Sequence, residues 1–311
     1  MLSRQSLHRM TLPGAVVAIT LFCTIAARGE AQQTSTTFES VIKQQNERDV
    51  VGYIQPLADV LAADLNLGWF HTAYIPRSKF SIALELVATG TAIGDKQKTY
   101  VAHAPAGFQR DTFTTATIFG GQGTTVTQNG LSYKGSDGFF DAEYFPSAVP
   151  QLRVGGILGT EVVARYFSSK LISTLNEKDF PELKVLGYGA RHSISQYIPA
   201  MPLDIAVSFF YTDVEWGDMV EADATSFGAQ VGKSFQVLSL YGGVQSESGY
   251  MDLKYTSTNP SQTTPVAVDL EVKNQVRFTA GAMASLGPLQ LFGDAGFGNV
   301  VTYAAGFRLG F

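Results

Sequence analysis

Apolar and polar residues alternate along most of the chain from Phe80 onward. In the segment FSIALELVA, Phe80, Ile82 and Leu84 share one face, whereas Ser81 and Glu85 lie on the other. The same alternation recurs in residues 151–167, 203–212, 225–232, 238–247 and 274–286, and residues 183–192 are strand-like with ambiguous faces. Because successive side chains of a strand point to opposite faces, this period of two predicts an all-β protein.

Two architectures assign these faces differently. In a secreted sandwich the apolar faces meet in one core, whereas in an outer-membrane barrel they face lipid and polar or small residues line the lumen. The apolar faces extend over about 9 to 11 residues, the length that a tilted strand needs to cross a bilayer. Glycine is abundant on the polar faces, and short and long connections largely alternate. We therefore predict an antiparallel transmembrane β-barrel of about ten strands, within a range of about eight to fourteen.

The chain ends on an amphipathic strand, NVVTYAAGFRLGF. Apolar residues occupy every second position back from the terminus, including Tyr303, Phe307, Leu309 and Phe311. This pattern resembles the carboxy-terminal signal that the barrel assembly machinery recognises in outer-membrane proteins. That machinery is therefore an expected partner.

Residues 1–31 have the pattern of a cleaved secretory signal peptide. Basic residues come first, the apolar run TLPGAVVAITLFCTIAA follows, and a small-residue site precedes the cleavage point. A transmembrane helix and a lipidated Cys23 are alternatives, but Pro13 and Gly14 argue against the helix and Phe22 against lipidation. Cys23 is the only cysteine, so the mature chain would have no thiol chemistry. The predicted location is the cell outer membrane.

Residues 32–67 have helical periodicity and form a second region. In QPLADVLAADLN, the side chains of Leu57, Val60, Leu61 and Leu65 recur at helical spacing, and Pro56 suits a first helical position. We expect a short helical plug, lid or periplasmic segment here, followed by the barrel over residues 68–311.

The strand count follows from the alternating runs. About eight runs begin at or after Leu152, and the run at Phe80 with one further strand before Pro150 would give about ten. Residues 95–111, 168–181 and 248–272 are predicted to be long polar loops, and residues 116–149 a loop with one irregular strand.

Candidate chemistry is sparse. The net charge of −5 gives no reason to expect nucleic acid. His192 lies beside a predicted turn, where a turn-stabilising hydrogen bond is the simplest role. The string VGKSF lacks the glycine spacing of a phosphate-binding loop, and the acidic loop DVEWGD reads as solvated. We expect no enzymatic activity, no cofactor and no metal site.

Charges of both signs are predicted to face the lumen. This pattern favours pairing across a filled interior, since rings of one sign would instead indicate ion selectivity. Glu247 is also predicted to face the lumen. These candidates are Glu85, Arg153, Glu161, Arg165, Asp204, Arg277, Asp294 and Arg308.

Four segments carry a resemblance to a known family: LNLGWFHTA (65–73), TIFGG (117–121), GTEVVARYF (159–167) and RHSISQYIP (191–199). Together they resemble a family of exported outer-membrane β-barrel proteins of Bacteroidota-type bacteria, distantly similar to the FadL-type transporters of hydrophobic compounds. The resemblance implies a barrel with an amino-terminal helical hatch in its lumen, a part that the helix at 55–66 could play. The chain is shorter than those transporters, so a complete hydrophobic channel does not follow.

Two functions of different classes remain open. The first is passage or binding of small hydrophobic molecules at the outer membrane, with the amino-terminal helix as plug or gate. The alternative is a sealed structural or adhesive barrel that displays surface loops without transport. A barrel-embedded lipid enzyme is disfavoured by the scarcity of histidine. Expected partners are outer-membrane lipid, lipopolysaccharide, the assembly machinery and, for the first function, small hydrophobic ligands.

Overall fold

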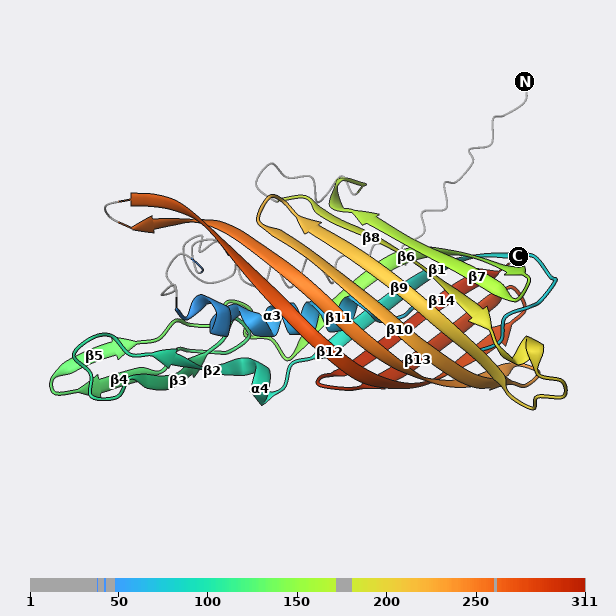
Figure 1. The fold of residues 1–311 in the computed structure, drawn as a ribbon, viewed down its shortest axis with the longest axis horizontal. Coiled ribbons are helices and arrows are strands. Elements are labelled where there is room, and N and C mark those ends of the chain that lie inside the picture. The colour runs from blue at the N-terminus through green and yellow to red at the C-terminus, as the bar shows by residue number, and fades with distance from the viewer. Residues whose placement is uncertain (1–37, 39–41, 43–47, 172–180, 260–261, 311) are drawn as a thin grey trace, which may run out of the picture.

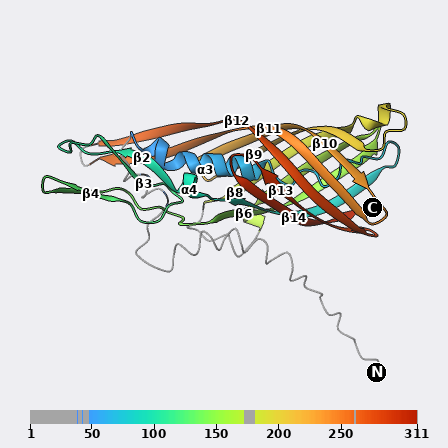
Figure 2. The ribbon, with the colours of Figure 1, turned by 90° about the horizontal axis from the view of Figure 1, so that it is seen from below.

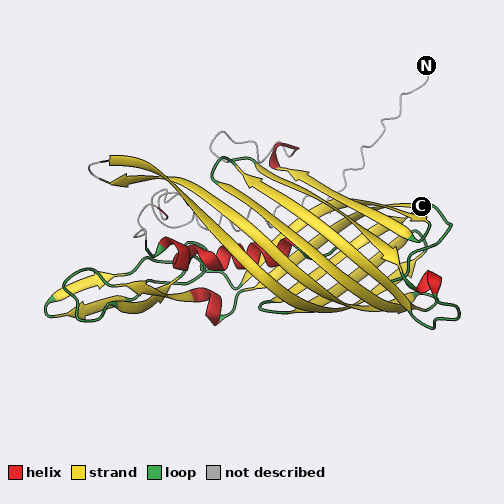
Figure 3. Ribbon diagram, in the orientation of Figure 1, coloured by secondary structure: helices red, strands yellow, loops and turns green. Residues whose placement is uncertain are grey.

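The protein folds as a closed antiparallel barrel of ten strands in the order β1-β14-β13-β12-β11-β10-β9-β8-β7-β6 (Figures 1 and 3). The structure, a computed structural model, describes residues 38, 42, 48–171, 181–259 and 262–310. The predicted fold class and strand number are confirmed. The expected signal peptide lies outside the described residues.

The barrel strands differ widely in length. They are β1 (Ser81–Ala92), β6 (Tyr144–Ile157), β7 (Thr160–Ser168), β8 (Leu183–Ser193), β9 (Asp204–Trp216), β10 (Val220–Ser234), β11 (Leu238–Asn259), β12 (Gln262–Leu286), β13 (Leu289–Phe297) and β14 (Val301–Gly310). We call the end where β1 begins and β14 ends the turn end, and the opposite end the hairpin end.

The connection between β1 and β6 lies at the hairpin end. It contains the short helix α4 (Asp95–Lys98) and two small hairpins, which are drawn on the same side as the tips of β11 and β12 (Figure 1). The hairpins are β2 (Thr99–His103) with β3 (Thr112–Ala116), and β4 (Thr125–Gln128) with β5 (Leu131–Lys134). Two 3₁₀ turns, η2 (Ser169–Leu171) and η4 (Ser195–Tyr197), lie in other connections.

In the turn-end half of the barrel, apolar side chains face outward and polar ones inward, as predicted. On β1, Leu84 is 56% exposed on the outer face whereas the neighbouring Glu85 is 1% exposed in the lumen. On β14, Tyr303, Phe307 and Leu309 all face outward; Phe311 lies outside the described residues. The outer face of this half therefore carries the apolar belt of a transmembrane barrel.

In the hairpin-end half, the two faces exchange their character. On β11, Leu240 and Val244 are exposed on the outside, but beyond an irregularity between Glu247 and Gly249 it is Leu253 that is fully buried inside. The outward positions there are polar or charged. Strands β11 and β12 have 22 and 25 residues, about twice the length needed to cross a bilayer. The hairpin-end half is therefore built like a water-soluble domain, with an apolar interior and a charged exterior.

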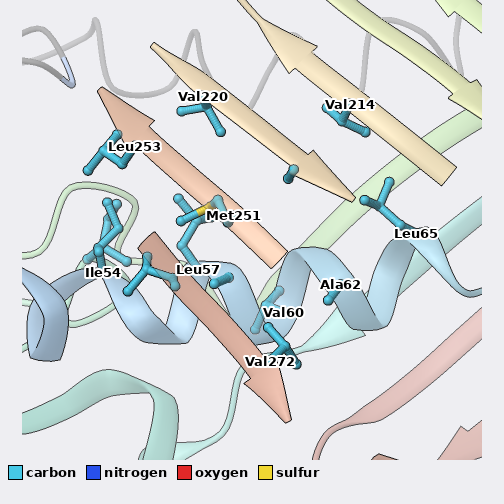
Figure 4. Close-up of a cluster of buried hydrophobic side chains, with 14 of the residues drawn as sticks. Ile54, Leu57, Val60, Ala62, Leu65, Val214, Val220, Met251, Leu253 and Val272 are labelled. Atoms are coloured by element: carbon cyan, nitrogen blue, oxygen red, sulfur yellow. The ribbon is translucent and has the colours of Figure 1, made fainter. Parts of the chain in front are cut away.

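Helix α3 (Val50–Leu65) lies inside this hairpin-end half (Figures 2 and 4). After it, residues 66–80 run through the lumen to the start of β1 at the turn end. We refer to α3 and residues 66–80 as the plug segment. Pro56 was predicted at the first helical position, but it lies in the helix interior. A proline there has no N–H to donate to the carbonyl of residue 52, so α3 lacks one backbone hydrogen bond.

Two strand predictions were wrong in detail. Residues 151–167 do not form one run, because Leu158 and Gly159 both have positive φ (53° and 68°) and make the tight turn between β6 and β7. The further strand expected before Pro150 is the first half of β6.

Three loop predictions also differ from the structure. Residues 95–111 contain α4 and β2. Residues 248–272 are not a loop, because β11 and β12 continue through almost all of them as one long hairpin. Residues 116–149 contain the β4–β5 hairpin and the first residues of β6. In residues 248–272 the outward positions of β11 and β12 include Asp252, Lys254 and Asp269, and this polarity concealed the strand character.

The position of the apolar belt predicts a depth-dependent cost of charge. Leu84→Arg places a cation on the lipid-facing side of the belt, where it should lower the free energy of unfolding by about 2–4 kcal/mol. Tyr250→Arg, at an outward position of β11 in the hairpin-end half, should change it by less than about 1 kcal/mol. Urea unfolding of both variants in lipid vesicles measures the difference, and equal costs would contradict the assignment of the belt.

Candidate functional site

The lumen contains a chain of buried ion pairs contributed by four neighbouring strands. Arg153 on β6 donates through Nε to Glu85 Oε1 of β1 at 2.7 Å and through Nη1 to Glu161 Oε1 of β7 at 2.5 Å. Arg191 on β8 donates through Nη2 to the same Glu161 oxygen at 2.6 Å. All four side chains are no more than 3% exposed. Such pairs are retained only with good geometry, since each ion has lost its water.

The register of the strands creates this chain directly. Glu161 of β7 lies directly opposite Arg191 of β8. On its other side Glu161 lies opposite Gly155 of β6, two residues from Arg153, so the three ionic side chains are neighbours on one inner surface. Arg308 on β14 reaches the same cluster, with Nε 3.7 Å from Glu85 Oε1.

The plug segment is held mainly through its backbone. Arg277 donates to the carbonyl of Ala63 at 2.7 Å, and Arg165 donates to the carbonyls of Leu65 and Leu67 at 3.3 and 2.9 Å. These are the last carbonyls of α3 and the residues just beyond it. A helix C-terminus carries partial negative charge and unsatisfied carbonyls, so two guanidinium groups complement it.

Further along the plug segment, the ionic chain itself supplies the donors. Arg153 donates to the carbonyl of Trp69 at 2.9 Å, and Arg191 donates to the carbonyl of Thr72. Gln151 of β6 donates to the carbonyl of Gly68 at 3.1 Å. The same arginines that pair with Glu85 and Glu161 therefore also bind the plug.

Trp69 is the largest side chain buried in this contact, at 1% exposure. Its ring stacks on Phe210 with centroids 4.7 Å apart, and the Arg165 guanidinium carbon lies 3.4 Å from its ring centroid. This sandwich combines aromatic stacking with a cation–π contact. Gly187 leaves space for it, because a Cβ there would lie 2.7 Å from Arg165 and 3.0 Å from Trp69.

Glycine positions on the inner wall let other parts of the plug segment approach closely. A Cβ at Gly249 would lie 2.6 Å from Ala62 Cβ, one at Gly243 2.9 Å from Phe70, and one at Gly232 3.3 Å from Ala73 Cβ. The abundance of glycine on the polar faces therefore serves the docking of the plug.

Asp64 is the charged side chain through which α3 binds the wall. It is 2% exposed and accepts hydrogen bonds from Thr89 at 2.9 Å, Thr91 at 3.3 Å and Ser147 at 2.5 Å. These hydroxyls belong to β1 and β6, on the wall opposite to the strands that cover the apolar face of the helix. Asp64 therefore fixes the rotation of α3 in the barrel.

The apolar face of α3 fills the hairpin-end half (Figure 4). Leu57, Val60 and Leu65 are buried and Leu61 is partly buried in one cluster. The cluster also takes in inward residues of β9 to β12: Val214, Val220, Ala222, Ala224, Met251, Leu253, Tyr255, Leu270 and Val272.

The helix also contacts the β1–β6 connection. Tyr53 donates its hydroxyl to the carbonyl of Asp137 at 3.0 Å, and burial together with the nearby Tyr100 and Asp137 raises the pKa of Tyr53. Slight burial raises the pKa of the Asp137 carboxyl, but hydrogen bonds from Lys134 and the Gly123 N–H outweigh this and lower it.

The remaining predicted lumen-lining residues lie outside the ionic chain. Asp294 accepts from the Tyr241 hydroxyl at 3.0 Å, and Arg277 pairs with Glu247 at 2.7 Å. Asp204 lies at the turn-end tip of β9 and is partly exposed. The turn residue His192 contacts Thr160 Oγ1 at 2.9 Å and the Tyr197 hydroxyl at 3.0 Å.

Several residues of the site were missed from sequence. Arg191 was overlooked because the faces of its strand were ambiguous, although the glycines at 187 and 189 mark its inward parity. Asp64 and Trp69 flank the end of the predicted helix and have no β periodicity. The residues that the structure describes contain no cluster of His, Cys, Asp or Glu suited to a metal ion. In the same part of the chain, no helix is long and apolar enough to cross a membrane.

A family model matches residues 10–311, and its description is a family of unknown function, DUF6588. The chain belongs to this family. No curated protein is significantly similar to the DUF6588 chain.

Solved structures with a similar fold are outer-membrane barrels. The attachment invasion locus protein Ail of Yersinia pestis has 11% identity over 75% of this chain and 99% of its own, with a TM-score of 0.27. The outer-membrane protease OmpT of Escherichia coli has 5% identity over 76% and 98%, with a TM-score of 0.37. The toluene transporter TbuX of Ralstonia pickettii has 10% identity over 84% and 93%, with a TM-score of 0.26. At these values the likeness concerns the barrel fold alone.

The ionic chain predicts a large difference between two glutamate substitutions. Glu161→Gln leaves Arg153 and Arg191 without their shared carboxylate and should lower the free energy of unfolding by about 3–5 kcal/mol. Glu215→Gln removes the partner of Lys184 in an exposed pair and should cost less than about 1 kcal/mol. Urea unfolding in detergent measures both, and a small cost at Glu161 would show that the ionic chain does not hold the barrel together.

Proposed function

We propose that the DUF6588 chain is an outer-membrane barrel kept closed to solutes by its own plug segment, with its hairpin end serving as a binding platform outside the bilayer. The observation that carries the proposal is the contact between wall and plug. Side chains of β6, β7, β8 and β12 donate to plug carbonyls from Ala63 to Thr72.

This contact favours a resident plug because of what its loss would cost. If the plug segment left, four arginines would each exchange a plug carbonyl for water, and a hydrogen bond to a charged group is worth about 1.5–3 kcal/mol net. The ring of Trp69 and the apolar face of α3 would lose their packing as well. These contacts therefore favour the plugged state over an open one.

The apolar belt supports insertion in the outer membrane, with the turn end toward the periplasm and the hairpin end outside. The proposal includes export through a cleaved signal peptide. Its expected partners are lipopolysaccharide and the barrel assembly machinery. The proposed role is non-enzymatic. The Bacteroidota-type origin and the tie to FadL-type transporters remain expectations from sequence.

A second candidate is passage or binding of small hydrophobic molecules, and one observation favours it. The inner wall that α3 covers is apolar, with Val214, Val220, Met251, Leu253 and Val272 facing the helix. A displaced α3 would uncover a hydrophobic vestibule at the hairpin end. The ionic chain would still lie between that vestibule and the turn end.

A tethered plug distinguishes the two candidates. A Cβ at Gly232 would lie 3.3 Å from Ala73 Cβ, close to the separation of about 3.5–4.5 Å in a disulfide, and 2.8 Å from the Leu240 carbonyl oxygen, so the β10 backbone must shift slightly to accept it. The double variant Ala73→Cys with Gly232→Cys should therefore cross-link in the mature chain. In proteoliposomes, the closed-barrel proposal predicts that the wild type admits small sugars and a hydrophobic probe no faster than protein-free vesicles, and that oxidation changes nothing.

Weakening the anchor provides the positive control. Arg153→Gln with Arg191→Gln removes the donors to Trp69 and Thr72 together with the ion pairs to Glu85 and Glu161. In protein shown to be folded by heat-modifiable gel migration, it should raise sugar flux at least about tenfold over the wild type. Ala73→Ser with Gly232→Ser controls for the substitutions themselves. Flux through the wild type that oxidation of the cysteine pair abolishes and reduction restores would overturn the closed barrel in favour of gated passage.

A further inference from the structure

Strand β12 has an edge that the closed barrel does not cover. It pairs with β11 from Gln262 to Ala284, with one irregularity, but with β13 only from Phe278 to Leu286. Within the described residues, the part of β12 from Gln262 to Arg277 therefore has a strand neighbour on one side. Toward the hairpin end, β13 extends only to Phe297 and β14 begins only at Val301. We call the gap that these two strands leave beside residues 262–277 of β12 the notch. Closure removes edges only where strands are paired on both sides.

The direction of the free backbone groups can be assigned from one contact. Gln55 of α3 donates to the carbonyl of Glu271 at 3.3 Å, so this carbonyl points away from β11 toward the notch. The N–H and C=O of one residue in an antiparallel strand point to the same side, and the side alternates along the strand. The backbone groups of Ala267, Asp269 and Glu271 therefore all face the notch.

The side chains around this edge have a consistent chemistry. Asp269 and Glu271 are exposed on the outer face, and Asp59 lies on α3 beside Gln55, with which it shares a 3.0 Å hydrogen bond. Val51, one helical turn before Gln55, is 47% exposed. The notch thus combines an unpaired backbone edge, carboxylates on its rim and an apolar residue of α3 on the same helix face as Gln55.

We propose that the edge of β12 from Val266 to Val272 binds an extended cationic peptide segment of a partner protein, which adds one strand to the sheet. Main-chain hydrogen bonds to Ala267, Asp269 and Glu271 supply affinity, as in other cases of strand addition. Basic side chains on the outer face pair with Asp269 and Glu271, and apolar side chains on the inner face cover Val51. This assigns a partner class to the platform at the hairpin end, and so rests on the proposed function for its location.

A second copy of this chain fits the edge less well. Pairing β12 with its own copy would bring Asp269 and Glu271 of two molecules onto one surface, and like charges on adjacent strands are destabilising. A basic segment has the opposite sign at the same positions.

A binding titration tests the proposal with the purified, detergent-solubilised mature chain. The probe is a fluorescent ten-residue peptide of alternating valine and lysine, and its anisotropy reports binding. Replacing lysine by glutamate should weaken binding at least about tenfold, and so should N-methylation of alternate peptide bonds on one edge. Ala267→Pro removes one N–H from the free edge while the ladder to β11 stays intact, and should also weaken binding about tenfold.

Charge variants separate edge binding from general attraction. Asp269→Lys with Glu271→Lys should weaken binding about tenfold or more. Asp213→Lys with Asp223→Lys, at outward positions of β9 and β10, is the matched control and should change it less than about threefold. Heat-modifiable gel migration confirms that each variant is folded.

The proposal is overturned if the N-methylated peptide binds as well as the parent, if both charge variants lose affinity equally, or if Ala267→Pro dissociates a dimer of the chain. Because binding is measured in detergent and closure in vesicles, failure of one is distinguishable from failure of the other. A flux-competent barrel could still bind the peptide, and a closed barrel could fail to do so.

Discussion

A guanidinium group buried in a barrel without an acceptor is the constraint on which this structure depends. Arg153, Arg165, Arg191 and Arg277 all face the lumen and are at most 3% exposed. Wall carboxylates satisfy part of the donors of Arg153, Arg191 and Arg277, and the Gln151 side chain accepts from Arg165. The backbone of the plug segment accepts from all four. The plug can do this because α3 ends at Leu65 and Gly68 adopts a positive φ of 66°, which releases the following carbonyls from helical hydrogen bonding. Wall and plug therefore each supply what the other lacks.

Strand β11 passes from lipid into water, and its outer face changes from apolar to polar where it does so. On β11 the outward residues change from Leu240 and Val244 to Asp252 and Lys254 beyond the irregularity at Gly249. Lipid requires apolar side chains outside, while water requires them inside. The same period of two serves both, with the opposite assignment of faces.

Sequence predicted the barrel, its strand number and the facing of the belt, because lipid contact imposes a period of two that is readable without a structure. It did not predict β11 and β12 through residues 248–272, since outward residues such as Asp252, Lys254 and Asp269 made the segment look like a polar loop. The strands β6 and β7 were merged because Leu158 occupies a turn position with φ of 53°, where asparagine or glycine is usual.

The sequence predicted which charged residues face the lumen, but not which groups they bind there. Glu85, Arg153, Glu161, Arg165 and Arg277 could be placed on inward faces by parity alone. Their main partners on the plug are backbone carbonyls, which every residue possesses and no sequence pattern marks. Only the register of four strands and the path of residues 66–73 determine which carbonyl meets which arginine.

The plug and the notch have a common cause in the unequal strand lengths. Strands β13 and β14 do not extend beyond Phe297 and Val301 toward the hairpin end. The inward apolar residues Leu270 and Val272 of β12 therefore lie above these strands and are not covered by them. Helix α3 covers them instead and buries both residues to 4% exposure or less. The helix can cover a side-chain face, but it cannot pair a strand backbone, and within the described residues Gln55 binds one carbonyl of β12, that of Glu271. Filling the interior therefore leaves the edge of β12 available, so a closed lumen and an open strand edge are two results of the same short strands.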